Sequence, residues 1–137
     1  MKAYLDSSSF AKRFVDEKGS DLVESTCAEA TSLGLSMLCV PEIVSALTRR
    51  KRERTLTPSQ YALAKRRLIE DVRDADLINV TTSVIGSSIT ILEANALRTL
   101  DALHVACALE WGADLFVSSD KRQLHAAKRS GLATKKV

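Results

Sequence analysis

The sequence predicts a three-layer α/β/α fold with a central, mostly parallel sheet of four to five strands and about seven flanking helices. Short apolar runs alternate along the chain with segments of helical periodicity, as is typical of parallel strands joined by helices. Glycines and prolines stand near the boundaries of these segments, where helices end and begin. The length of 137 residues is that of one domain, and we expect residues 1–137 to form it.

The strands are expected where the short apolar runs occur. Gly34, Gly112 and Gly131 each stand just ahead of such a run, and we expect them to end the preceding helices. The predicted strands cover residues 2–5, 35–40, 77–80 and 114–117, with a possible short strand at 133–137.

The helices are expected in the longer segments between the strands. Pro41 and Pro58 suit the first turns of two of them, and Thr57 lies directly before the second of these prolines. The predicted helices cover residues 7–16, 20–32, 41–53, 58–75, 83–96, 100–111 and 120–130.

The composition narrows the range of functions. A net charge of +3 permits a polyanionic partner, but only 4% of residues are aromatic, which argues against a base-stacking platform. Cys27, Cys39 and Cys107 are odd in number and widely spaced, so we expect reduced core thiols. Neither a signal-peptide pattern nor an apolar run of about 18 residues is present, so we expect a cytoplasmic protein without a membrane span.

Four acids lie at the starts of predicted helices: Asp6, Glu42, Asp101 and Asp120. Three of them follow an apolar strand, and all carboxyl ends of parallel strands open onto one edge of the sheet. Asp101 has to be brought there by its helix. Gathered carboxylates repel one another by roughly 4 kcal/mol per pair at ~4 Å and an effective dielectric constant near 20. A hard divalent cation relieves this repulsion, so the set predicts a Mg²⁺ or Mn²⁺ site.

Each acid on its own also has a simpler explanation. Glu42 in a first turn complements the helix dipole, and Asp120 is a suitable N-cap. Asp6 and Asp101 have serine or threonine neighbours that can cap their helices instead. The metal hypothesis therefore depends on the four acids as a set.

Four motifs resemble those of PIN-domain nucleases, most closely the VapC-like toxins of bacterial and archaeal toxin–antitoxin pairs. The similarity covers nearly the whole chain in the right order, and the third motif is the most specific. The motifs are Tyr4-Leu-Asp-Ser-Ser-Ser-Phe-Ala-Lys-Arg-Phe, Pro41-Glu-Ile-Val-Ser-Ala-Leu, Leu97-Arg-Thr-Leu-Asp-Ala-Leu-His-Val-Ala and Phe116-Val-Ser-Ser-Asp-Lys-Arg-Gln-Leu.

This resemblance implies a PIN-like fold, cleavage of RNA that depends on Mg²⁺ or Mn²⁺, and catalysis by the acidic quartet. It also implies a small antitoxin partner and a homodimer. Many members of the family carry threonine where this chain has Ser118, a departure that keeps the hydroxyl group.

The four acids are given separate roles in this hypothesis. Asp6 and Asp101 bind the principal metal ion, and Asp120 completes its coordination or holds a second ion. Glu42 orients a metal-bound water or accepts its proton. Hydrogen bonds that hold these carboxylates or the substrate are expected from Ser7 and Ser118.

Several basic residues are candidates for RNA-phosphate contacts. Arg98, Lys121 and Arg122 lie next to the predicted acidic site. The alternative interpretation of these three residues is that they are ordinary charged surface residues without a ligand. Lys12 and Arg13, one to two turns beyond Asp6, are further candidates.

The densest basic run spans residues 49–54 and lies farther away. It is roughly 10–18 Å from the site along its helix, at about 1.5 Å per residue. A solvated helix end is the favoured interpretation there, although the run could still steer RNA or bind an acidic peptide.

His104 follows Asp101 by three residues, on the same helical face. It can reach toward the metal site or lie beneath it as a hydrogen-bonded core histidine, and its apolar neighbours favour the second arrangement.

Three other functions remain open at this stage. A housekeeping RNA-processing nuclease of the same fold has the same sequence features. An inactive nucleic-acid-binding domain keeps the fold without catalysis. The third is a signalling domain that accepts a phosphoryl group on Asp6. Such a domain requires an acidic pair after its first strand, and this chain has only Asp6 there.

Overall fold

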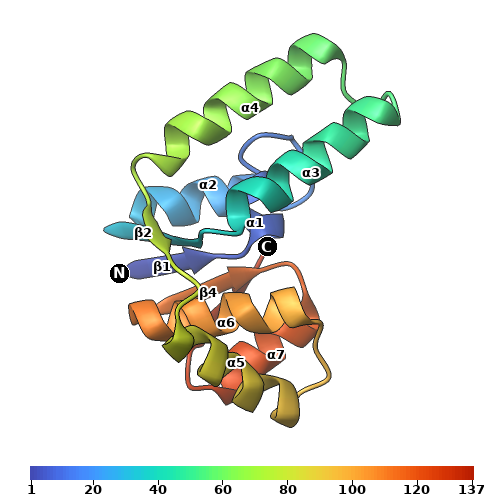
Figure 1. The fold of residues 1–137 in the computed structure, drawn as a ribbon. Coiled ribbons are helices and arrows are strands. Elements are labelled where there is room, and N and C mark those ends of the chain that lie inside the picture. The colour runs from blue at the N-terminus through green and yellow to red at the C-terminus, as the bar shows by residue number, and fades with distance from the viewer.

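The computed structural model describes residues 1–137 and contains a central sheet of five parallel strands (Figure 1). The strand order is β3-β2-β1-β4-β5, and every neighbouring pair is parallel. The predicted α/β fold with a mostly parallel sheet is therefore confirmed. The strands are β1 (Lys2–Leu5), β2 (Ser32–Ser36), β3 (Asp76–Ile78), β4 (Leu115–Ser118) and β5 (Ala133–Lys136).

Seven helices cover the two faces of this sheet. In Figure 1, α1 to α4 lie on one side of the strands and α5 to α7 on the other. Two separate groups of buried apolar residues correspond to these two layers. The helices are α1 (Ser7–Ala11), α2 (Ser20–Glu29), α3 (Cys39–Arg52), α4 (Pro58–Val72), α5 (Thr82–Ala94), α6 (Thr99–Trp111) and α7 (Lys121–Arg129).

The central strand β1 contributes to both apolar groups. Successive side chains of a strand point to opposite faces. Ala3 and Leu5 pack with the α1 to α4 layer, whereas Tyr4 packs with the other layer and stacks on Phe116 at 5.5 Å between ring centroids. Because both faces are covered, β1 is apolar and buried from Ala3 to Leu5.

Helices α3 and α4 form an antiparallel pair that extends beyond the sheet (Figure 1). Leu47 of α3 and Leu68 of α4 belong to the same apolar group, which holds the pair to the sheet. The turn between them ends in a capping box, in which Thr57 and Gln60 satisfy each other's backbone amides. The basic run at residues 49–54 lies at the outer end of this pair, and within it Arg50 forms an ion pair with Glu17.

The predicted strand at 35–40 was misplaced by several residues. The strand ends at Ser36, and α3 begins at Cys39, two residues before Pro41. The apolar residues after Ser36 suggest a continuing strand, but the Ser36 hydroxyl accepts a hydrogen bond from the Leu38 amide and turns the chain. Glu42 consequently lies in the first turn of α3, six residues after the strand ends.

The glycine prediction was correct at two positions and wrong at the third. Gly112 ends α6 with φ = 71°, and Gly131 follows α7 with φ = 93°. Gly34 does not end a helix but lies inside β2, where a Cβ atom would stand 2.6 Å from the ring of Trp111. Close approach of the Trp111 ring explains the glycine there.

Helix α1 is shorter than the predicted segment 7–16, because it ends at Ala11. The Ser20 hydroxyl donates to the carbonyl of Lys12 and fixes the turn that follows the helix.

The three cysteines are free, as predicted. Cys39 and Cys107 are buried, and Cys27 is half-buried. Burial raises the pKa of the Cys39 thiol to about 12, so this thiol is unreactive near neutral pH. No helix combines the length and the apolar character required to cross a membrane.

Candidate functional site

A polar pocket lies at the carboxyl edge of the sheet, where β1 and β4 end. Its volume is about 360 Å³, and no hydrophobic residue lines it. All four acids predicted from the sequence line this one pocket, together with Arg98, His104 and three serines. The complete lining is Asp6, Ser7, Ser8, Glu42, Arg98, Asp101, His104, Ser119 and Asp120.

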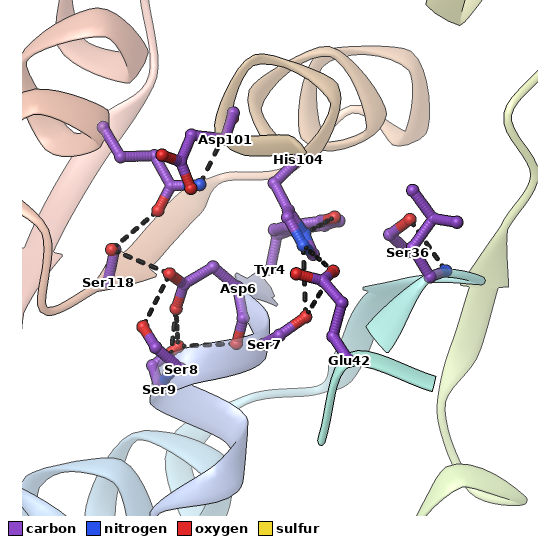
Figure 2. Close-up of polar contacts among 12 residues, drawn as sticks. Tyr4, Asp6, Ser7, Ser8, Ser9, Ser36, Glu42, Asp101, His104 and Ser118 are labelled. Carbon is purple, nitrogen blue, oxygen red and sulfur yellow. Dashed lines mark hydrogen bonds and ion pairs between the residues drawn. The ribbon is translucent and has the colours of Figure 1, made fainter. Parts of the chain in front are cut away.

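Asp6 is held in a fixed orientation at the end of β1. Its Oδ1 accepts hydrogen bonds from the amide and hydroxyl of Ser9, and its Oδ2 accepts from the hydroxyls of Ser8 (2.8 Å) and Ser118 (3.0 Å) (Figure 2). The residue is only 5% exposed, and all of these donors are neutral. No cationic side chain forms an ion pair with this carboxylate.

The expectation that a serine could replace Asp6 as the cap of the first helix was not met. Asp6 itself is the N-cap of α1, because its side chain accepts from the Ser9 amide. Asp120 caps α7 in the same way through the amides of Arg122 and Gln123. Only Oδ1 of Asp120 takes part in the cap, so Oδ2 is available to a ligand.

Glu42 is connected to two buried residues by a chain of hydrogen bonds. Its Oε1 lies 2.9 Å from the Ser7 hydroxyl and 2.8 Å from Nε2 of His104. Nδ1 of His104 lies 2.9 Å from the hydroxyl of Tyr4. His104 is 2% exposed. It is therefore a hydrogen-bonded core histidine beneath the site, the arrangement that its apolar sequence neighbours predicted.

This chain of contacts favours the ionised form of Glu42. Burial opposes ionisation, but the hydrogen bond and charge of His104, together with the Ser7 hydroxyl, hold the pKa of Glu42 below its ordinary value. An ionised carboxylate only accepts hydrogen bonds, so Nε2 of His104 carries the proton that faces Glu42. Burial raises the pKa of Tyr4 well above its ordinary value, so the phenol remains protonated.

Asp101 enters the pocket from the first turn of α6. Its side chain is 18% exposed and pairs with Arg98 at 3.2 Å. The Arg98 side chain is 84% exposed, and such surface pairs contribute only about 0–1 kcal/mol. Arg98 can therefore turn toward a ligand at little cost.

Two residues that support the site were not predicted from the sequence. Tyr4 holds His104, and the fully buried Gln123 donates to the backbone carbonyl of Asp101 while its Oε1 lies 2.8 Å from the Ser118 hydroxyl. Gln123 thus links α7, α6 and β4. Its signal in the sequence was a polar residue on the helix face that also carries Ala126 and Ala127.

The donor set suits a hard divalent cation, although it does not form a closed cage. No three histidine, cysteine or acidic side chains stand close enough together to hold an ion by themselves. Mg²⁺ usually keeps several waters and is bound through one or two carboxylates, so carboxylates around one polar pocket fit a hydrated ion. In addition, the buried Ser119 hydroxyl lines this pocket without a hydrogen-bond partner.

The basic candidates separate into two groups. Arg98, Lys121 and Arg122 line a hollow of about 650 Å³ that adjoins the acidic pocket and shares Asp101 and Asp120 with it. The expectation for the other two candidates was wrong. The amine of Lys12 donates to the carbonyl of Lys18, and Arg13 forms ion pairs with Glu24 and Asp71, so both are engaged away from the pocket.

The fold and the pocket together define a class of protein. It is a parallel α/β protein in which carboxylates from separate elements surround one polar pocket at the sheet edge, beside basic side chains. That arrangement suits a hard cation and a phosphate group.

Comparison with known proteins identifies the family within this class. The model of the PIN domain family matches residues 3–129, and the chain belongs to this family. The chain is also similar to ribonuclease VapC45 of Mycobacterium tuberculosis, with 32% identity over 123 residues that cover 89% of this chain and 85% of that protein.

Two solved structures share the fold. The M. tuberculosis toxin VapC20, described as cleaving the sarcin-ricin loop, superposes with a TM-score of 0.72 at 14% identity and covers 98% of this chain and 99% of that one. A toxin–antitoxin complex from Klebsiella pneumoniae superposes with a TM-score of 0.69 at 14% identity, over 98% of this chain and 99% of that one. At these identities the likeness shows the fold alone.

Proposed function

We propose that this protein is a metal-dependent endoribonuclease, the toxin of a toxin–antitoxin pair that acts in the cytoplasm, with residues 1–137 as its single nuclease domain. The observation that carries this proposal is the meeting of four carboxylates from separate elements in one polar pocket, in which the exposed Arg98 is the one arginine or lysine side chain. The ribonuclease names of its curated relatives support the same reaction.

The residues proposed to hold the ion, directly or through its bound waters, are Asp6, Asp101 and Asp120, with Mg²⁺ or Mn²⁺ as the ion. Such an ion, when bound, lowers the pKa of water and polarises phosphoryl oxygens. Asp6 is kept in position by its serine donors, and Asp120 offers the oxygen that its helix cap leaves available. Ser7 and Ser118 serve as hydroxyl donors to Glu42 and Asp6.

Glu42 is proposed to orient the attacking water rather than to take its proton. A carboxylate with a lowered pKa accepts hydrogen bonds well but is a weak proton acceptor near neutral pH. His104 and Tyr4 hold its position from below.

The RNA backbone is proposed to contact Arg98, Lys121 and Arg122, which line the hollow beside the acids. The proposed protein partners are a small antitoxin, supported by the toxin–antitoxin complexes among structures of this fold, and a second copy of this chain in a homodimer. Sedimentation of the purified chain, alone and with a co-expressed antitoxin, measures both assemblies.

A phosphoacceptor role for Asp6 is disfavoured by its surroundings. The residue after Asp6 is a serine, and no lysine lines the pocket, whereas a phosphoacceptor domain of this kind requires an acidic pair and a lysine there.

Cleavage of labelled RNA tests the proposed function. Purified protein is incubated with total RNA in Mg²⁺, Mn²⁺ or EDTA, and the cut ends are mapped. We expect cleavage only with the metals, and a loss of about 100-fold or more in Asp101→Asn, because several kcal/mol of charge stabilisation disappear.

The exposed acid Asp74, in the turn between α4 and β3, lines no part of the acidic pocket and provides the control variant Asp74→Asn, which should cleave normally. Undiminished cleavage in EDTA, or by Asp101→Asn, would reject the proposal.

A further inference from the structure

The acidic pocket opens into a longer groove along α7. The hollow of about 650 Å³ shares Arg98 with the acidic pocket and shares Lys121 and Arg122 with the next hollow, of about 350 Å³. That one shares Arg129 with a fourth hollow, of about 390 Å³. We call this series the α7 groove; residues 94–98 form one wall and one face of α7 forms the other.

The α7 groove carries positive charge along its whole length. Beyond Asp101 and Asp120 no acidic residue lines it. Lys121, Arg122 and Arg129 are exposed, and none of them forms an ion pair. His125 lies between them on the same helix face, since residues four apart are neighbours on a helix.

The helix dipole explains only part of this pattern. Cations near a helix C-terminus are favourable, which accounts for Lys128 and Arg129. Lys121 and Arg122, however, occupy the first turn, where a cation is unfavourable by roughly 0.3–1 kcal/mol. Charge placed against the dipole, beside the acidic pocket, points to an anionic ligand.

We propose that one strand of RNA leaves the acidic pocket along the α7 groove, so that phosphates on one side of the cleaved bond contact Lys121, Arg122 and Arg129. From Lys121 to Arg129 the helix rises about 12 Å, at 1.5 Å per residue. This inference takes its substrate class, RNA, from the proposed function. It adds the direction in which the strand leaves the acidic pocket and the residue, Arg129, at which the phosphate contacts end.

The other wall of the acidic pocket offers no comparable contact. There Glu42, Ser7 and His104 line the pocket, and the basic run at residues 49–54 lies at the outer end of α3. Binding is therefore expected to be asymmetric about the cleaved bond.

Binding without cleavage tests the groove. Anisotropy of a fluorescein-labelled single-stranded RNA 12-mer is measured in EDTA with the full chain, its Arg129→Ala variant and the Lys128→Ala control. Both variants lose one exposed charge from the last turn of α7, but Lys128 does not line the groove. Thermal melting checks that both remain folded.

We expect Arg129→Ala to weaken binding several-fold and to lower the slope of log K against log salt by about 0.7, the value for one phosphate contact to a single strand. Lys128→Ala should leave both quantities close to the wild type. Equal effects of the two variants would overturn the inference. The inference would also be overturned if Arg129→Ala weakened the binding of an acidic 12-residue peptide but not the binding of RNA, since the groove would then serve a protein partner.

The two proposals fail separately. Cleavage without a difference between the two variants removes the groove and leaves the nuclease. Binding that depends on Arg129, without cleavage under any metal condition, removes the nuclease and keeps the groove.

Discussion

At the scale of single residues, the acids of the pocket combine structural and chemical roles. Asp6 and Asp120 are helix N-caps, and Glu42 and Asp101 lie in first turns. Glu42 and Asp120 thus occupy the first-turn and cap positions that their simple explanations predicted, and these positions do not compete with a functional role. A carboxylate fixed by a cap is also one that is preorganised for a ligand.

The lowered pKa of Glu42 predicts a pH dependence of stability. Because its pKa in the folded protein is below the ordinary value of 4.5, its ionised form stabilises the fold above that pH. This contribution is lost as the pH falls through the lower, folded-state value. Urea unfolding between pH 6 and 3 should show a steeper fall in unfolding free energy for the wild type than for Glu42→Gln. Parallel curves for the two proteins would contradict the assigned interaction with His104.

The sequence was sufficient to predict the four acids of the pocket, but not all of the residues that hold the pocket side chains in position. The four acids follow strands or begin helices, which is a local pattern. Tyr4 and Gln123 act through partners about 100 and 22 residues away in the sequence, at His104 and Asp101. Such distant pairings depend on packing, which a local pattern does not specify.

At the scale of elements, the predicted strand and helix boundaries were wrong where a side-chain hydrogen bond turns the chain. An apolar run predicted a strand at 35–40, but the Ser36 hydroxyl and the start of α3 turn the chain after residue 36. Side-chain hydrogen bonds to the backbone compete with regular structure and leave only a weak trace in apolar periodicity.

The two glycines at 34 and 86 give a matched test of strand and helix packing. Gly34→Ala forces a Cβ to within 2.6 Å of Trp111, whereas nothing lies within 4 Å of a Cβ at Gly86 in α5. We expect Gly34→Ala to lower the unfolding free energy by about 1–3 kcal/mol through overpacking. Gly86→Ala should raise it by about 0.5–1 kcal/mol through helix propensity. Urea unfolding of both variants measures the contrast, and stabilisation by Gly34→Ala would refute the packing of Trp111 on β2.

At the scale of the whole molecule, the strand order brings the acids together. β1 and β4 are adjacent, and their register pairs Leu5 with Val117, so Asp6 comes to lie beside Ser118. The alternation of strands and helices predicted a parallel sheet, but not which strands are neighbours. That order depends on how the two helical layers pack against the sheet, which local sequence patterns do not encode.

We propose that acids from separate elements of the fold hold a divalent cation in a single pocket. Titration of Mn²⁺ followed by electron paramagnetic resonance measures this directly, because free and bound Mn²⁺ are distinguished without any RNA. We expect saturable binding that weakens about tenfold or more in Asp101→Asn and in Asp120→Asn, and not in Asp74→Asn. Equal Mn²⁺ affinity in all four proteins, or no binding by the wild type, would contradict it.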